Sequence, residues 1–218
     1  MLFLLALLPL LGALAPALAI RLGRNAAALA AGAVTLSALV VLAGLTPAVM
    51  AGGTYQASVP WIPALGLNAS LFLDPLGLMF AGMILGIGLL IIIYARFYLA
   101  AADPMGRFFT YLLLFQGAML GIVLSDNVLL LLIFWELTSL SSFLLIGFWR
   151  HSPEARQGAR MALFVTGGGG LALIAGLLIL GHVAGSYELT VILQQGEAIK
   201  ASPLYLPALL LILGGCFT

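Results

Sequence analysis

Seven apolar segments, separated by short connections that contain most of the charged residues, dominate this chain of 218 residues. They comprise residues 2–20, 26–49, 76–98, 108–125, 128–149, 160–183 and 203–218. A helix needs about 20 apolar residues to cross the hydrocarbon core of a bilayer. Only 7% of the residues are charged, too few to cover a surface that faces water. The sequence therefore predicts an all-α polytopic membrane protein with about seven transmembrane helices.

The two terminal segments each allow two interpretations. Ala17-Leu18-Ala19 resembles a signal-peptide cleavage site, but the basic residues follow the first apolar run instead of preceding it, which favours a retained helix. The last segment is short and reaches Thr218 without a polar flank. It is either a half-helix or the beginning of a seventh span. We expect the second, with the chain forming the N-terminal part of a larger helical subunit.

Arginines predict the orientation. Seven of the eight basic residues lie in or beside the connections after the first, third and fifth segments. They are Arg21, Arg24, Arg96, Arg107, Arg150, Arg156 and Arg160. Only Lys200 lies in an alternate connection. Basic residues accumulate in cytoplasmic loops, so we expect these three connections in the cytoplasm and the N-terminus outside.

Local signals mark several helix starts and the character of the other connections. A capping side chain precedes proline in Asp74-Pro75, Asp103-Pro104, Ser152-Pro153 and Ser202-Pro203. We interpret Asp74 and Asp126 as helix caps rather than ion ligands, with Asn127 adding to the cap at Asp126. Residues 50–73 predict an irregular or partly hairpin-like surface segment. Residues 184–201 predict a short amphipathic helix, interfacial or packed on the bundle, with Leu189, Ile192 and Leu193 on one side.

Four consecutive glycines, Gly167 to Gly170, lie within the sixth segment. Small residues allow close approach of membrane helices, and we expect that role here and in Gly82-x-x-x-Gly86 and Gly181-x-x-x-Gly185. A flexible, functional break in the helix is the alternative.

Glu136 is the one acidic residue in the middle of an apolar segment, between Phe134-Trp135 and Leu137-Thr138-Ser139. An ionised group at the centre of a spanning helix costs about 2.5–3.5 kcal/mol on insertion scales. We therefore expect Glu136 to have a partner or a function. The functional interpretation is a proton site, since burial favours the neutral acid and a nearby cation favours the charged form. The structural alternative is a protonated carboxyl that only ties two helices together.

A polar sector accompanies this acid. On a helix with 100° per residue, Trp135, Thr138, Ser139 and Ser142 share one arc, and Glu136 lies just beyond it. Such a sector must face protein or water, although serine and threonine also bond to their own helix without further function. No basic residue lies at the depth of Glu136, so a charged partner would come from beyond Thr218 or from another subunit. One cysteine and two distant histidines give no sign of a metal or haem site.

The string Phe134 to Trp149 resembles the fifth helix of the large A subunit of Mrp-type Na⁺/H⁺ antiporters. That family is related to the antiporter-like proton-pumping subunits of respiratory complex I. The similarity extends to other strings of the chain: Ser125-Asp126-Asn127, Ala162 to Gly170, Gly185 to Leu189, and Gly215 to Thr218. Leu137 follows Glu136 where the complex I subunits have glycine, which favours the Mrp A subunit.

The resemblance implies that Glu136 is the proton-pathway glutamate, paired with a lysine expected directly after Thr218. It also implies a hetero-oligomeric complex in a bacterial cell membrane that exchanges cytoplasmic Na⁺ (or Li⁺ or K⁺) for external H⁺. No organic cofactor is implied. Residues 1–73 would form an N-terminal two-helix segment with an outer loop, and residues 74–218 the antiporter-like domain.

Two other functions remain open on the sequence alone. The chain could belong to a proton-pumping membrane subunit of a complex I-like quinone oxidoreductase or membrane-bound hydrogenase. It could also be a structural scaffold without transport.

Overall fold

Helices make up most of the computed structural model, which describes all 218 residues. The helices are α1 (Leu2–Gly12), α2 (Leu14–Ala19), α3 (Arg24–Met50), α4 (Pro75–Tyr98), α5 (Met105–Leu124), α6 (Val128–Ile146), α7 (Pro153–Ala184), α8 (Leu189–Gln194), α9 (Gly196–Lys200) and α10 (Tyr205–Cys216). Two strands, β1 (Tyr55–Ile62) and β2 (Leu67–Leu73), form the only sheet. Six helical spans are long and apolar enough to cross a membrane. The shorter α10 accounts for the seventh predicted segment.

The first span is bent rather than continuous. The apolar run predicts one helix over residues 2–20, but α1 and α2 meet at Ala13, between Pro9 and Pro16. Proline removes a backbone donor and crowds the preceding turn, which accounts for a break in this region. The bent span packs closely on α5, where a methyl group added at Gly117 would overlap Leu10.

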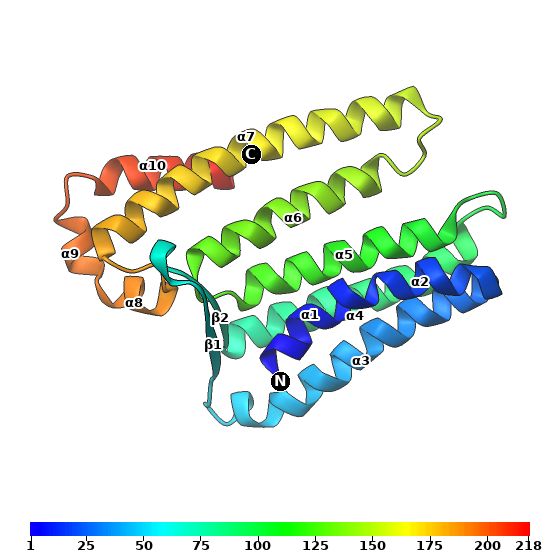
Figure 1. Cartoon of the computed structure of the whole chain (residues 1–218), viewed down its shortest axis with the longest axis horizontal. Coiled ribbons are helices and arrows are strands. Elements are labelled where there is room, and N and C mark those ends of the chain that lie inside the picture. Colours follow the sequence, from blue (N-terminus) through cyan, green and yellow to red (C-terminus); the bar gives the residue numbers. More distant parts are fainter.

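The connections that carry arginine gather at one end of the bundle (Figure 1). Arg24, at the start of α3, donates hydrogen bonds of 2.8–3.2 Å to the carbonyls of Leu99, Ala101 and Asp103 in the α4–α5 connection. Arg107 donates to the Phe148 carbonyl at 3.2 Å. The three connections that the arginines predict on one side of the membrane thus lie at the same end of the bundle. The location of this end in the cytoplasm stays a prediction.

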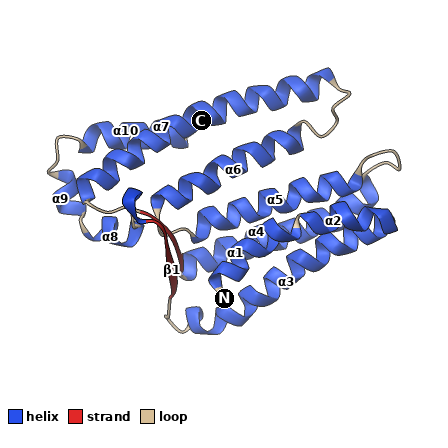
Figure 2. Ribbon diagram, viewed as in Figure 1, coloured by secondary structure: helices blue, strands red, loops and turns tan.

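A β-hairpin covers the opposite end of the bundle (Figure 2). The strands pair antiparallel from Tyr55–Leu73 to Ile62–Leu67, with a register shift between Pro60 and Ile62. The sequence predicts an irregular or partly hairpin-like segment for residues 50–73, and the hairpin-like alternative is correct. Strand β1 is mostly exposed, whereas β2 is mostly buried.

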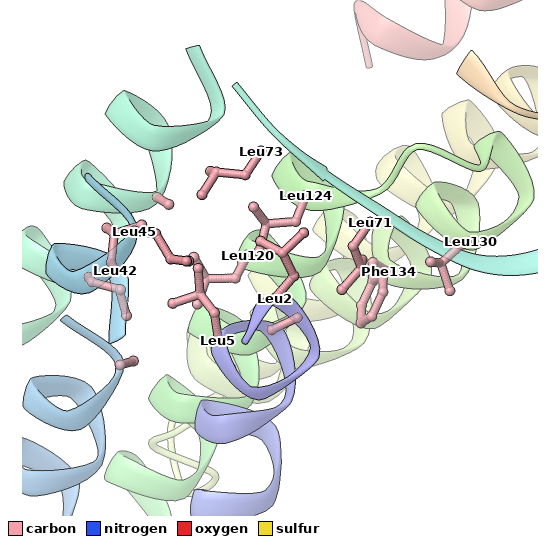
Figure 3. Close-up of a cluster of buried hydrophobic side chains, with 14 of the residues drawn as sticks. Leu2, Leu5, Leu42, Leu45, Leu71, Leu73, Leu120, Leu124, Leu130 and Phe134 are labelled. Carbon is pink, nitrogen blue, oxygen red and sulfur yellow. The ribbon is translucent and has the colours of Figure 1, made fainter. Parts of the chain in front are cut away.

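The largest core cluster lies beneath this hairpin and joins the strands to five helices. Figure 3 shows Leu71 and Leu73 of β2 facing leucines of α1, α3 and α5. Leu130 and Phe134 of α6 complete the cluster. Phe134 fits because Gly121 of α5 has no side chain, and a methyl group there would overlap the ring. The residue two positions before Glu136 therefore fixes α6 against α5.

The predicted caps were right at two helices and wrong at the others. Asp74 Oδ1 accepts from the Gly77 N–H at 2.7 Å, and Ser152 Oγ from the Ala155 N–H at 3.1 Å. Asp103 instead accepts from the Ala100 N–H and the Trp149 indole, and α5 begins two residues later, at Met105. The Ser202 hydroxyl accepts only from the Leu204 N–H, ahead of α10.

Two polar side chains that the sequence interpretation missed meet inside the bundle. Thr35 of α3 is fully buried and Gln116 of α5 is 2% exposed. The Thr35 hydroxyl donates to Gln116 Oε1 at 3.0 Å, and the Gln116 amide donates to the Ile84 carbonyl of α4 at 3.2 Å. Gly88 leaves the space that this amide occupies. Lipid offers no alternative partners, so these bonds hold α3, α4 and α5 in register.

Replacing Thr35 with Val should lower the free energy of unfolding by about 1 kcal/mol, because one carbonyl lone pair of Gln116 then loses its partner. Denaturant titration of the intact protein in mixed micelles measures this change. Thr46→Val is the matched control on α3, since that hydroxyl bonds only to Leu42 of its own helix. Equal losses in both variants would contradict an interhelical role for Thr35.

Candidate functional site

Glu136 lies in the middle of α6, and its carboxylate faces α7. A methyl group added at Gly170 would overlap Glu136 Oε1, so the two residues touch across the helix interface. Gly170 is buried and close to the middle of α7, and the glutamate is partly buried. The carboxylate therefore fills the space that the missing side chain of Gly170 leaves.

The four glycines do not break α7, which runs continuously through them. The predicted close packing is found at two of the four, Gly169 and Gly170. Gly169 lies against the Thr218 side chain, and a methyl group on Gly215 of α10 would approach the Gly169 carbonyl to 2.7 Å. A methyl group on Gly167 or Gly168 would meet no atom within 4 Å. One pair of glycines thus admits α10 and the carboxylate of Glu136, while the other faces open space.

The other two glycine pairs do not bring helices together as predicted. A methyl group on Gly82 would only touch Leu42 at 4.0 Å, and Gly86 has no neighbour. Gly181 instead makes room for the Tyr187 ring. Gly185 ends α7 with a left-handed conformation, φ +67°, that suits glycine.

Glu136 has no charged or hydrogen-bonding partner within this chain. The single ion pair joins Lys200 and Glu197, at 3.0 Å on the surface. No hydrogen bond within the protein engages the carboxylate of Glu136, whose side chain is only partly buried. A carboxyl group in this position can exchange protons with water or with a neighbouring group, and it can compensate an incoming cation.

Most hydroxyls of the predicted polar sector bond within α6. Thr138 and Ser139 donate to the Trp135 carbonyl at 2.7 and 3.3 Å. The neighbouring Ser141 likewise donates to carbonyls of its own helix. Ser142 and the Trp135 indole have no hydrogen bond within the chain. The hydroxyl hydrogens of Thr138, Ser139 and Ser141 are thus bonded within α6. The lone pairs of the same hydroxyl oxygens remain available to water.

A second polar group, which we call the hairpin-end cluster, lies where the hairpin meets α6 and α8. It consists of Gln56, Asn68, Asp126, Asn127, Glu188 and Thr190. Asn68 and Asn127 both donate to Glu188 Oε1 at 2.9 Å. Sequence patterns gave no sign of this cluster, because its bonded pairs are up to 120 residues apart.

Asp126 does not cap α6, contrary to the prediction. Asn127 is the cap, accepting from the N–H groups of Leu129 and Leu130. Asp126 accepts from the backbone N–H and hydroxyl of Thr190, at 3.0 and 2.9 Å, and so caps α8 from outside. Gln56 donates to the same carboxylate at 3.3 Å. These bonds give Asp126 a structural role, and no three His, Cys, Asp or Glu side chains come together as metal ligands.

Two family descriptions match the chain. Residues 125–218, which include α6 and α7, match "NADH:quinone oxidoreductase/Mrp antiporter, TM". Residues 61–109 match "NADH-Ubiquinone oxidoreductase (complex I), chain 5 N-terminus". The first match contains Glu136, the four glycines and α10.

Curated relatives are antiporter components by name. The A/B component of a probable K⁺/H⁺ antiporter of Rhizobium meliloti is 50% identical over 195 residues, which are 89% of this chain and 20% of that protein. The A1 component of a Na⁺/H⁺ antiporter of Staphylococcus aureus is 46% identical over 169 residues, 78% of this chain and 21% of that protein. The chain thus spans about a fifth of the length of these relatives.

The fold recurs in a solved structure, that of the Mrp complex from a Dietzia species. One of its chains superposes with a TM-score of 0.84 at 32% identity. The match covers 99% of this chain and 23% of that one. The helical arrangement around Glu136 is therefore shared with a multisubunit membrane complex.

Asp126→Ala should loosen the hairpin-end cluster, because three donors then lose a charged acceptor. We expect amide hydrogen exchange in residues 186–195 to become at least about tenfold faster, since hydrogen bonds to charged groups contribute about 1.5–3 kcal/mol. Mass spectrometry of the exchanging protein measures this rate. Glu197→Ala is the control, since its ion pair is exposed. Unchanged exchange in the Asp126 variant would contradict the structural role.

Proposed function

Since this chain is homologous to the N-terminal part of the large A subunit of Mrp-type Na⁺/H⁺ antiporters, we propose that the whole protein is one component of a multisubunit monovalent cation/proton antiporter. It would be a secondary transporter component, not an enzyme. The complex would lie in the bacterial cell membrane with several other membrane subunits. It would exchange cytoplasmic Na⁺ for external H⁺.

In this proposal Glu136 takes up and releases the proton. The observation that carries it is the position of the carboxylate, in the middle of α6, against Gly170, with no partner in the chain. A purely structural glutamate would be expected to bond to a neighbouring helix, as Gln116 does. An acid that can be charged or neutral at this depth is costly to keep without function.

The charged partner of Glu136 would be a lysine, as the family resemblance implies. Thr218 Oγ1 lies against Gly169, the α7 neighbour of Gly170. The C-terminal end of α10 therefore lies beside the stretch of α7 that faces Glu136. A lysine there would favour the charged form of the glutamate when it approaches and the neutral form when it moves away.

Trp135, Thr138, Ser139 and Ser142 are proposed to line or hydrate the path to Glu136. Support comes from the serine and threonine oxygens, which keep free lone pairs after bonding within α6. Water in a spanning bundle needs such acceptors.

Na⁺ and K⁺ are the two candidate cations. The two relatives are named for K⁺ and for Na⁺, at similar identities to this chain. Exchange should therefore be measured with both ions.

A proton-pumping component of a complex I-like oxidoreductase is the second candidate, because both family descriptions name that enzyme. The antiporter names of relatives 46–50% identical to this chain favour the first. Cation-driven proton movement without quinone or an electron donor distinguishes the two.

Glu136→Gln should reduce cation/proton exchange by about 100-fold or more, because the amide keeps the shape but cannot carry the proton. Exchange is measured in inverted membrane vesicles containing the full complex, as the cation-induced change in a pH-sensitive dye. Glu197→Gln serves as the matched control on an exposed carboxyl. Full exchange by an assembled Glu136→Gln complex would leave only a scaffold role for this residue.

Gly170→Ala should reduce exchange by roughly 10- to 100-fold, because the added methyl group displaces the Glu136 carboxylate and misplaced groups lose this much activity. Gly168→Ala makes the same change on the same helix where space is open, and exchange should stay at the wild-type rate. The two variants are compared in the same vesicles at equal amounts of assembled complex. Equal activity in both would refute the contact between Glu136 and Gly170.

A further inference from the structure

Three arginines surround a pocket at the end of the bundle opposite the hairpin. The pocket has a volume of about 310 Å³ and lies between the end of α6 and the start of α7. Arg150 comes from the connection, and Arg156 and Arg160 come from α7. The last two are four residues apart and therefore project from the same face of the helix.

No carboxylate of the chain neutralises these arginines. None of the three forms an ion pair, since the single pair of the chain is Lys200–Glu197. The nearest acid in the sequence, Glu154, accepts from the Ser152 hydroxyl at 2.7 Å. Arg150 donates to the Tyr111 hydroxyl at 3.2 Å, a neutral partner that holds the guanidinium without compensating its charge.

The pocket continues into an apolar surface. A second hollow, of about 620 Å³, shares Arg156 and Arg160 and extends along α7 over Met161, Phe164 and Val165. Phe164 is 78% exposed and Met161 is 66% exposed. Within the first pocket, Phe143 and Leu144 of α6 supply further apolar surface. Positive charge at the helix ends thus passes directly into apolar surface toward the membrane interior.

We propose that this pocket binds the headgroup of an anionic phospholipid, with its phosphate between the arginines and its acyl chains along α7. Guanidinium groups suit phosphate because they offer several donors in a fixed plane. Basic pockets between spanning helices on the cytoplasmic side are suited to anionic headgroups. A free phosphate ion would use the arginines but leave the apolar surface without an occupant.

The test is native mass spectrometry of the intact complex in neutral detergent, titrated with phosphatidylglycerol or with phosphatidylcholine of the same chains. We expect tighter binding of phosphatidylglycerol. Arg156→Gln/Arg160→Gln should weaken the tightest site by roughly 30-fold, since each arginine near the surface contributes about 1 kcal/mol. The control, Arg21→Gln/Arg96→Gln, removes two arginines from the same end outside the pocket and should bind as the wild type does.

Three results would overturn the proposal. The first is equal binding of the two lipids to the wild-type complex, which needs no variant to fold. The second is an equal loss in the control variant, which would indicate a general charge effect. The third is displacement of phosphatidylglycerol by an equal concentration of inorganic phosphate, which would assign the arginines to a free anion.

Discussion

The cost of an unsatisfied polar group in hydrocarbon determines how this bundle is built. Lipid cannot hydrogen-bond, so each polar side chain at membrane depth must find its partners within the protein or in enclosed water. Gln116 does so through Thr35 and a carbonyl of α4. Thr138, Ser139 and Ser141 of α6 do so through carbonyls of their own helix. The bonds of Gln116 hold α3, α4 and α5 together.

Glu136 departs from this rule, and its departure is the basis of the proposed function. Its neighbours are well packed, since Phe134 inserts against Gly121 of α5 and Gly170 of α7 admits the carboxylate. The acid itself has no partner in the chain. A packed frame around one acid suits a proton site, because the frame fixes where the proton is taken up and released.

Local signals predicted more of the fold than of the site. The spans follow from hydropathy, and the caps at Asp74 and Ser152 follow from neighbours within a few residues. Asp103 could not be placed in this way, because its partner Trp149 is 46 residues away. Glu136 stands out in the sequence by its cost in the membrane and by the resemblance of its helix to the antiporter family. Its contact with Gly170 could not be predicted, because four glycines in a row do not reveal which of them faces α6.

Chemical modification of Glu136 with dicyclohexylcarbodiimide, which adds to protonated carboxyls in apolar surroundings, tests the proton-site assignment most directly. Labelled peptides are quantified by mass spectrometry from the same vesicles in which cation/proton exchange is measured. The assignment predicts that Glu136 is labelled more readily at low pH and that exchange falls in proportion to the labelled fraction. Complete labelling of Glu136 with undiminished exchange would contradict it.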